Sequence, residues 1–379
     1  MSEKLRVDMM ETGGWGGIHY YVYGLANALA GEAVDLAWLT HEKHELIDRP
    51  HRVPLAHVFR REAYLRTLAR LWRRWRQGRP HILHIQSLLA PRKELLLFLL
   101  CRLLGIRVVL TAHNVLPHEL RPFEKILYRW YYRLADALIL HSAQNRQRLL
   151  ELVPGLDQRR LHVVEHGNYE HFRDLELDRH QARQQLGLPA AAQVVLFFGA
   201  LRPYKGVDLL IEVVGPVRRA CPDALFVVAG HVLVGEAGQY ERQAAALGLG
   251  AADLELRFAY LTTAQAIAYV CASDLVVLPY REIYQSGVLL WAYSFGRPVL
   301  ATRVGSFPEC IEEGRSGWLV PKEDVPALQQ ALIRVLQDRE GLVRAGAYAR
   351  QLAATRFGWA AAARRTAQIY TEVVGGRQP

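Results

Sequence analysis

The sequence contains few cysteines and no long apolar segment. Its 379 residues include only four cysteines, none of them in a CxxC pair, so neither a zinc site nor a disulfide framework is indicated. The most lipid-like run, residues 95–100, is followed closely by Arg102 and is far shorter than the ~20 residues of a membrane-spanning helix. The first ten residues lack the apolar core of a signal peptide. These absences predict a protein of the reducing cytoplasm.

The composition lacks any bias toward disorder. Hydrophobic residues make up 51% and charged residues 22% of the chain, which is typical of a packed globular protein, and the length suggests about two domains. Basic residues exceed acidic ones by 47 − 37 = 10. An anionic partner is therefore expected, and nucleic acid, anionic lipid and a phosphorylated substrate all qualify.

Most of the positive charge lies between residues 51 and 80, where nine arginines accompany one acid, Glu62. Four apolar residues in this stretch recur at three- and four-residue spacing, which places them on one face of a predicted helix: Leu65, Leu68, Trp72 and Trp75. This pattern suits an amphipathic helix on an anionic membrane, with residues 59–79 as the contact. It suits equally a surface helix whose apolar face covers the core. Nucleic acid is the least favoured partner, because the aromatic residues lie on the apolar face and no nucleic-acid motif accompanies them.

A second segment, residues 125–133, also mixes aromatic and basic side chains. Tyrosine and tryptophan suit a lipid headgroup layer, but they equally suit a half-buried helix, which is slightly favoured.

Short apolar or β-branched runs alternate with helix-length segments throughout the chain. Strands spaced in this way need crossover connections, so the sequence predicts an α/β architecture of parallel sheets. One series ends near residue 168 and a second begins near residue 191. We therefore expect domains at 1–168 and 191–356, a linker at 169–190, and a last helical segment at 357–379. Because ligands of parallel sheets bind beyond the carboxyl ends of the strands, two such domains facing each other would enclose a site in a cleft.

A glycine cluster, Gly13–Gly17, follows the first short strand and precedes a helical pattern. Glycines there allow backbone amides to approach a phosphate or a sugar hydroxyl at a helix amino terminus, and Gly14, Gly16 and Gly17 are the candidates. A plain tight turn is the alternative. His19 follows closely, either as a general base or, more simply, as a packing histidine.

Two further histidines follow predicted strands. His113 comes directly after the strand at 108–112 and is expected to offer a hydrogen bond to substrate; a buried histidine satisfied by the backbone is the alternative. His166 follows the strand at 161–164 and, with the adjacent Gly167, suits a hinge beside a ligand.

The strongest signal is the run FGALRPYKG at residues 198–206. It joins the first strand of the second series to a helix, so Gly199, Arg202 and Lys205 are predicted to lie at a strand end beside a positive helix terminus. An arginine fork and a lysine point charge can together neutralise a diphosphate as its ester bond breaks.

Two later segments offer further contacts. Ser286 and Gly287 precede a helix, so that a hydroxyl and backbone amides are available to phosphate oxygens. Glu309 follows the strand at 299–301 and either caps the next turn or contacts a sugar hydroxyl.

Taken together, these motifs resemble those of the GT-B nucleotide-sugar glycosyltransferases, in particular glycosyl transferase group 1 (family 4-like). The resemblance runs over nearly the whole chain, through the glycine loop, His113, His166–Gly167, FGALRPYKGVD, LPYREIYQSG, FGRPVLATRVGSFPE and Gly317–Val320. It implies two facing Rossmann-like domains, an amino-terminal one for the acceptor and a carboxyl-terminal one for the nucleotide sugar. It also implies a last helix, 357–379, that packs back on the first domain.

The same resemblance implies roles for individual residues. Arg202 and Lys205 would hold the donor diphosphate in place of a metal, Ser286 and Gly287 would add contacts to it, and Glu309 would lie nearby. His113 and the glycine loop would face the transferred sugar and the acceptor. No cofactor is implied, since the nucleotide-diphosphate sugar is a substrate.

The chain departs from the family at one place. Members commonly carry two glutamates eight positions apart, but here the second position is Trp291 and the first is Ile283. Glu282, adjacent but out of register, is the candidate for the missing contact. An inverting enzyme would need a base such as His19, whereas a retaining enzyme would use a donor phosphate oxygen instead, so the stereochemistry stays open.

The sequence therefore predicts a hexosyltransferase that moves a sugar from a nucleotide-diphosphate donor to a lipid-linked or glycan acceptor at the inner face of the plasma membrane, in the synthesis of cell-surface polysaccharide or glycolipid. Two alternatives remain. The same fold can serve an epimerase, hydrolase or phosphorylase, or a catalytically silent member that binds a membrane or a partner.

Overall fold

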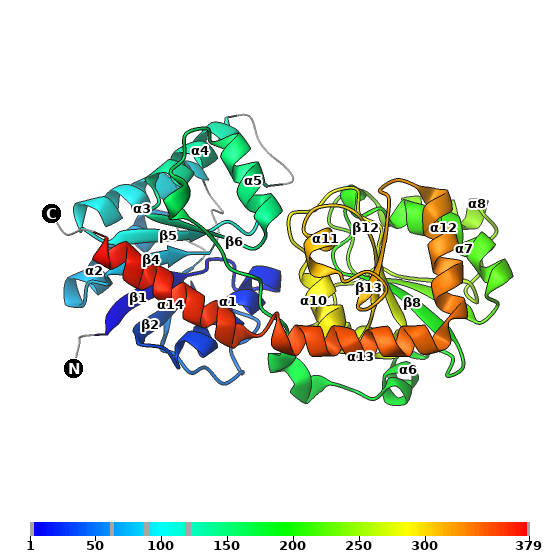
Figure 1. Cartoon of the computed structure of the whole chain (residues 1–379). Coiled ribbons are helices and arrows are strands. Elements are labelled where there is room, and N and C mark those ends of the chain that lie inside the picture. Colours follow the sequence, from blue (N-terminus) through cyan, green and yellow to red (C-terminus); the bar gives the residue numbers. More distant parts are fainter. Residues whose placement is uncertain (1–3, 61–63, 87–90, 118–122, 377–379) are drawn as a thin grey trace. The chain divides into compact units, whose positions relative to one another are not determined.

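The computed structural model describes residues 4–60, 64–86, 91–117 and 123–376. The chain divides into two compact units (Figure 1). Unit 1 comprises residues 1–167 together with 357–379, and unit 2 comprises residues 168–356. The chain therefore leaves unit 1, builds unit 2 and returns to unit 1 for its last helix.

Unit 1 contains a parallel sheet of seven strands in the order β3-β2-β1-β4-β5-β6-β7. The strands are β1 (Leu5–Met10), β2 (Val34–His41), β3 (Leu55–Phe59), β4 (Ile82–Ile85), β5 (Arg107–Thr111), β6 (Ala137–Leu140) and β7 (Leu161–Val163). The helices are α1 (Gly16–Leu29), α2 (Tyr64–Gln77), α3 (Pro91–Leu103), α4 (Glu124–Leu134), α5 (Ala143–Leu152), the 3₁₀ turn η1 (Gln158–Arg160) and α14 (Trp359–Gly375). Because the chain steps one way from β1 to β2 and the other way from β4 to β5, right-handed crossovers place α1 and α3 on opposite faces of the sheet.

Helix α14 packs along α1 in unit 1 (Figure 1). The Trp359 ring lies so close to Gly24 and Gly167 that a Cβ at either position would overlap it. Further along the helix, the Tyr370 hydroxyl lies 2.6 Å from Nδ1 of His84 on β4. The last helix therefore completes the core of unit 1 through a fitted tryptophan and a buried hydrogen bond.

Unit 2 contains a parallel sheet of six strands in the order β10-β9-β8-β11-β12-β13. The strands are β8 (Gln193–Phe198), β9 (Ala224–Ala229), β10 (Leu254–Arg257), β11 (Leu275–Leu278), β12 (Val299–Thr302) and β13 (Gly317–Val320). The helical segments are η2 (Glu170–Leu175), α6 (Arg179–Leu186), η3 (Pro203–Lys205), α7 (Val207–Ala220), α8 (Ala237–Ala246), α9 (Thr263–Ala272), α10 (Gly287–Ser294), α11 (Phe307–Cys310), α12 (Val325–Gln337) and α13 (Arg339–Thr355). Every residue of β8, β9, β11 and β12 is buried, which explains their continuous apolar sequences.

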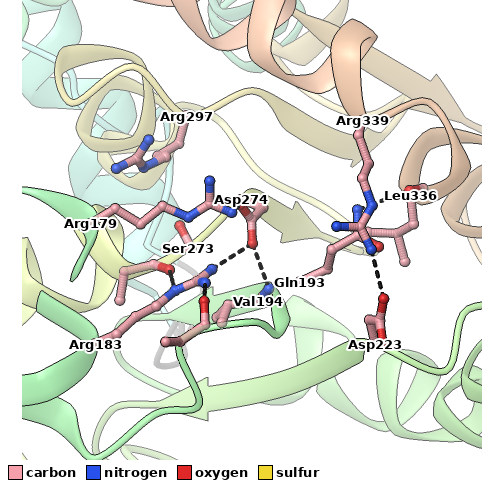
Figure 2. A network of polar contacts seen from close by, with 12 residues as sticks. Arg179, Arg183, Gln193, Val194, Asp223, Ser273, Asp274, Arg297, Leu336 and Arg339 are labelled. Atoms are coloured by element: carbon pink, nitrogen blue, oxygen red, sulfur yellow. Dashed lines mark hydrogen bonds and ion pairs between the residues drawn. The ribbon is translucent and has the colours of Figure 1, made fainter.

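The segment predicted as a linker, 169–190, contains η2 and α6, and both group with unit 2. A capping box formed by Asp178 and Gln181 starts α6. Figure 2 shows how the helix is held: Asp274, just before β11, accepts hydrogen bonds from Arg183 (2.8 Å) and from the backbone amide of Val194 (2.7 Å), and it also pairs with Arg179. One largely covered carboxylate thus ties α6 to the starts of β8 and β11.

Most predicted strands coincide with strands of the structure, and the α/β fold of parallel sheets is confirmed. Two strands were not predicted: β3, which lies inside the arginine-rich stretch, and β13 at Gly317–Val320. Both are short and border their sheets, so they lack the unbroken apolar runs of the central strands.

Candidate functional site

Arg202 and Lys205 lie at the carboxyl end of β8, where the sheet order of unit 2 reverses direction. From β8 the chain steps to β9 on one side, and β11 lies on the other side. Such switch points leave room for a ligand beyond the strand ends. The loop begins at Gly199 and ends at Gly206, both with positive φ, and a Cβ at Gly206 would overlap the Pro279 carbonyl oxygen. Glycine is therefore required where this loop passes the end of β11.

The ammonium of Lys205 is buried without a counter-ion. The residue is only 8% exposed, and its Nζ lies 5.6 Å from the centre of the Tyr280 ring. Burial, together with the nearby positive charge of Arg202, lowers the pKa of Lys205 to about 8. Within the described ranges no carboxylate pairs with this ammonium. The site therefore holds a buried positive charge that a bound anion can neutralise.

His231 adds a third basic group at the same strand ends. It follows β9, and burial lowers its pKa, with Lys205 and Arg202 contributing next. The backbone of Leu201 donates to the His231 carbonyl oxygen at 2.8 Å. Sequence patterns did not indicate this residue, because a lone histidine after a strand carries no local signal.

The loop after β11 lies against the loop after β8. Arg281 donates to Asp208 on α7 (2.9 Å and 2.6 Å) and to the Pro203 carbonyl oxygen (2.9 Å), which fixes one loop on the other. Ser286 is buried and precedes α10. A Cβ at Gly199 would lie 3.5 Å from both Lys205 Nζ and the Val288 side chain. The structure thus places Gly199, Lys205 and the start of α10 together, as the strand-end argument requires.

Trp291 lies inside α10 and is a packing residue. Its ring stacks on Tyr169 at 4.6 Å and on Phe172 at 5.5 Å. Glu282 is exposed on the preceding loop, and Glu309 is part of α11, where its carbonyl oxygen accepts from Arg356 at 2.9 Å. At the position where the family commonly has its second glutamate, the side chain of this chain therefore stacks on aromatic rings.

In unit 1 a buried carboxylate organises the glycine loop. Glu11 follows β1 and accepts hydrogen bonds from the amides of Gly13 (2.6 Å) and Gly14 (3.0 Å). The amide of Gly16 donates to Glu45 at 3.0 Å. Three loop amides are thus already bound to carboxylates of the same unit, in keeping with the tight-turn alternative, whereas a Cβ at Gly17 would meet only open space.

His19 is completely buried. Its Nδ1 lies 2.9 Å from a carboxylate oxygen of Glu11, and its ring lies 4.9 Å from that of Trp38. The ring has no exposed atom with which to reach a substrate, so the structure favours the packing alternative over a general base. Glu11 was missed in the sequence because its partners are brought together only by the folded loop.

His113 belongs to a group of histidines at the carboxyl ends of four adjacent strands. His84 lies on β4, His113 follows β5, His141 follows β6 and His166 follows β7. Tyr21 of α1 packs among three of these rings, 4.7 Å from His113, 5.0 Å from His141 and 4.8 Å from His166. Sheet order, and no sequence motif, brings them together.

Burial keeps three of these rings neutral. It lowers the pKa of His84 to about 3 and that of His141 to about 4, and it lowers the pKa of His113 well below its ordinary range, with His141 as the next cause. His141 Nδ1 lies 2.9 Å from the Val164 carbonyl oxygen, and its Nε2 lies 3.0 Å from His113 Nδ1. The carbonyl requires a proton on His141 Nδ1, so His141 Nε2 accepts the proton of His113 Nδ1.

A hollow of about 170 Å³ opens beside His113. Gln86, Thr111, His113 and Asn114 contribute its polar groups, and Tyr128 and Tyr132 contribute aromatic ones. His166 is buried next to this group, with its Nδ1 2.7 Å from the Gly167 carbonyl oxygen, immediately before the boundary between the units. Neutral polar groups around a small hollow suit hydroxyl-bearing ligands.

Helix α2 confirms a helix in the arginine-rich stretch but not the single apolar face predicted for it. Trp75 is buried and donates to Asp8 at 2.8 Å, and Arg74 also donates to Asp8 (2.9 Å and 3.1 Å). Leu65 and Trp72, by contrast, are exposed, with Trp72 41% accessible. The core covers only part of the apolar stripe of α2. Trp75 packs in the core, and Leu65 and Trp72 remain at the surface.

None of the described helices is long and apolar enough to cross a membrane. A search of the same residues finds no cluster of three or more histidine, cysteine or acidic side chains arranged to hold a metal ion.

The comparisons with known proteins match both units. Residues 15–168 match the model "Glycosyltransferase Family 4", and residues 192–338 match "Glycosyl transferases group 1". The chain belongs to these glycosyltransferases. The structure of HepE from Anabaena in complex with UDP-glucose superposes on this family member with a TM-score of 0.79 at 18% identity, covering 97% of this chain and 100% of that one, which supports the GT-B fold.

Curated relatives match a large part of this family member. The D-inositol 3-phosphate glycosyltransferase of Streptomyces bingchenggensis is 34% identical over 64% of this chain and 54% of its own length. The GDP-mannose:glycolipid 4-beta-D-mannosyltransferase of Xanthomonas campestris is 32% identical over 59% of this chain and 58% of its own. The chain thus spans little more than half the length of the curated relatives it matches.

Proposed function

We propose that this protein is a hexosyltransferase that moves a sugar from a nucleotide-diphosphate sugar to a lipid-linked or glycan acceptor, in the synthesis of cell-surface polysaccharide or glycolipid. The single observation that carries the proposal is the buried Lys205 ammonium beside Arg202 at the switch point of unit 2. Burying a cation without a counter-ion is costly, and a diphosphate would offset that cost.

The chemistry follows from these charges. As the bond between sugar and diphosphate breaks, negative charge accumulates on the leaving group and the sugar becomes oxocarbenium-like. Two cations held beside the diphosphate would stabilise that charge. Ser286 and the amide of Gly287 would add neutral hydrogen bonds at the start of α10, and Glu282 and Glu309 are the nearby carboxylates for sugar or ribose hydroxyls.

We assign the acceptor and the transferred sugar to unit 1, at the hollow beside His113. A neutral imidazole, the Gln86 amide and Asn114 can exchange hydrogen bonds with hydroxyl groups without imposing charge. Gly17, at the open side of the glycine loop, and His166 border the proposed region. His19 is not assigned a direct role.

We further propose that the protein works at the cytoplasmic face of the plasma membrane. The exposed side of α2 offers Leu65 and Trp72 with Arg66, Arg73 and Arg76, and no acidic residue lies in this helix. Apolar and basic side chains on one surface suit a membrane with anionic lipids. A lipid-linked acceptor would be presented at the same surface.

Donor binding and transfer can be measured on the purified chain. The thermal midpoint is recorded with UDP-glucose and GDP-mannose, the donors named for a neighbour and a relative, and with the matching diphosphates. Donor binding should raise the midpoint of the wild type and of Lys322→Met, an exposed lysine control, but not that of the double variant Arg202→Met/Lys205→Met. Equal stabilisation of all three proteins would contradict the diphosphate assignment.

The reaction type is then decided by acceptor dependence. Nucleoside diphosphate should be released only when a glycolipid or glycan extract is supplied, and sugar should appear in that fraction. Release at the same rate without acceptor would identify a hydrolase. No release with any donor that binds would identify a silent member.

A further inference from the structure

A second hollow in unit 1 lies at the edge of the sheet opposite to His113. It measures about 250 Å³ and forms where α3 ends, β5 begins and α4 gives way to β6. Phe98, Leu99, Ile106 and Leu134 make its apolar walls, and Arg102 and Arg107 stand at its polar side. It shares no lining residue with the His113 hollow, although β5 and α4 contribute residues to both, so it belongs to a different site.

An arginine-rich basin adjoins this hollow. The basin measures about 560 Å³, and Arg102, Arg107, Leu134 and Asp136 line both spaces. It adds Arg133, Arg159 and Arg160, which makes five arginines against two acids, Asp136 and Glu372. We refer to this larger hollow together with its five arginines as the arginine basin.

The two acids do not neutralise the arginine basin. Asp136 accepts from Arg107 at 3.0 Å and from the Val108 amide at 2.8 Å, and Glu372 accepts from Arg365, outside the basin, at 2.8 Å. Asp157, outside the lining, pairs with Arg159 at 3.0 Å. Arg107 and Arg159 are thus paired with acids, and an excess of positive charge remains on the other three arginines.

Arg160 and Arg102 differ in how far the fold holds them. Arg160 donates to the carbonyl oxygens of Tyr132 and Arg133 at the end of α4, and its buried Nε has no partner. Arg102 has no ion pair or hydrogen bond to any residue in the described part of the chain. The basin thus combines one arginine that two carbonyl oxygens hold in place with another that is free to bind a ligand.

The surface beside the arginine basin is unusually apolar. Of the sixteen large apolar side chains that are exposed in the described ranges, seven lie on α3 and in the region from Phe123 through α4, the helices whose residues line these hollows. On α3, Leu99 and Leu103 follow one another by one turn, and Leu103 is 85% exposed. On α4, Ile126 and Trp130 are also one turn apart and exposed, and α4 packs beside α3.

We propose that the arginine basin binds the phosphate of an anionic phospholipid whose acyl chains lie against the leucines of α3 and Trp130 of α4. Guanidinium groups bind phosphate oxygens in pairs, and an apolar row beside them suits the lipid's hydrocarbon part. A soluble phosphate compound would use the arginines but leave the leucines in water. The proposal rests on membrane association as proposed above, and it does not depend on sugar transfer.

The position gives this lipid an anchoring role. Arg107 begins β5, whereas the His113 hollow lies beyond the end of the same strand. A lipid held at the start of the strands leaves the acceptor hollow open. The bound lipid is therefore neither donor nor acceptor.

The test compares vesicle binding by the full chain and by two double variants of equal charge. Arg102→Gln/Arg133→Gln removes two exposed arginines of the basin, and Arg219→Gln/Arg344→Gln removes two exposed arginines of unit 2. With vesicles of phosphatidylcholine containing phosphatidylglycerol, we expect the basin variant to lose about tenfold or more in partitioning and the control variant to lose little. Equal losses in the two variants, or none in the basin variant, would overturn the proposal.

A second arm distinguishes a lipid from a free phosphate compound. Dihexanoyl phosphatidylglycerol, used below its micelle concentration, should protect the amides near residues 102–107 from hydrogen exchange, whereas glycerol 3-phosphate at the same concentration should not. Leu99→Ser/Leu103→Ser should remove the lipid effect. Equal protection by both compounds would show a phosphate site without lipid preference and would refute the proposal, even if donor binding to unit 2 were intact.

Discussion

At the level of single residues, Lys205 links ligand binding to stability. Its ammonium is buried near a second cation, and the drop of its pKa from 10.5 to about 8 corresponds to about 3 kcal/mol of unfavourable free energy in the unliganded protein at neutral pH. A residue that binds a ligand is thus expected to lower the free energy of unfolding of the unliganded protein.

Lys205→Met should therefore stabilise the unliganded protein while it abolishes donor binding. We expect the free energy of unfolding of unit 2 to rise by about 1–3 kcal/mol at pH 7, measured by urea unfolding, with no shift on adding nucleotide. Lys322→Met is the control and should change neither quantity. A Lys205→Met protein that is less stable than the wild type would show that Nζ has favourable partners.

The same pKa predicts how donor affinity depends on pH. Below pH 8 the empty site already holds the ammonium, so binding takes up no proton there. Above pH 8 the empty site loses its proton, and a bound diphosphate must restore it, so affinity should fall by about tenfold per pH unit. Calorimetric titration from pH 7 to 9.5 measures this slope. In Lys205→Met the affinity should be weak and its pH dependence should retain only the nucleotide's own ionisation.

At the level of elements, the sequence predicted strands better than it predicted the faces of helices. Runs such as 194–198 and 275–278 are apolar because both sides of a central parallel strand are covered, so they can be recognised without the fold. In α2, the spacing of Leu65, Leu68, Trp72 and Trp75 fitted one face, but only the neighbours decide how much of that face is covered. Asp8, which binds Trp75 and Arg74, is more than sixty residues away in the sequence.

The arginines of α2 should separate into two classes. Arg74→Gln removes the ion pair with the buried Asp8 and should lower the free energy of unfolding by about 1–3 kcal/mol, without a matching loss of vesicle binding. Arg73→Gln/Arg76→Gln alters exposed residues and should reduce binding to anionic vesicles several-fold at unchanged stability. Thermal unfolding and vesicle sedimentation measure the two effects, and the opposite assignment would exclude α2 from the membrane surface.

The candidate site shows the same limit of sequence patterns. Arg202 and Lys205 were found because one continuous loop carries them after a strand. His84 and His141 were missed because each is a single residue whose partners come from other elements, and Glu11 was missed because only the folded loop brings its partners to it. The order of the strands in the sheet brings such groups together, and no local sequence pattern specifies that order.

At the level of the whole molecule, the histidines are divided unequally: twelve of the fifteen belong to unit 1 and three to unit 2. In unit 1, burial lowers the pKa of His44 and His141 to about 4 and that of His84 to about 3. Because these rings stay neutral in the fold and become charged in the unfolded chain, acid favours unfolding once the pH falls below 6.5.

Unit 1 should therefore lose stability before unit 2 on acidification. Between pH 6.5 and about 4, each such histidine should cost about 1.4 kcal/mol per pH unit, whereas near pH 7.5 no effect is expected. Hydrogen exchange at pH 5 and 7, corrected for intrinsic rates, should show lost protection in β4–β7 and little change in β8–β12. Equal losses in both units would contradict the histidine explanation.

The return of the chain to unit 1 for α14 has a consequence for biosynthesis. Unit 2 is encoded between the two parts of unit 1, so on the ribosome it can fold while unit 1 still lacks Trp359, which fills the space over Gly24 and Gly167, and Tyr370, which lies against His84. The amino-terminal unit is made first and completed last. Until α14 has been made, the nascent unit 1 exposes an unfilled groove along α1, and the synthesis of that helix decides whether the groove closes.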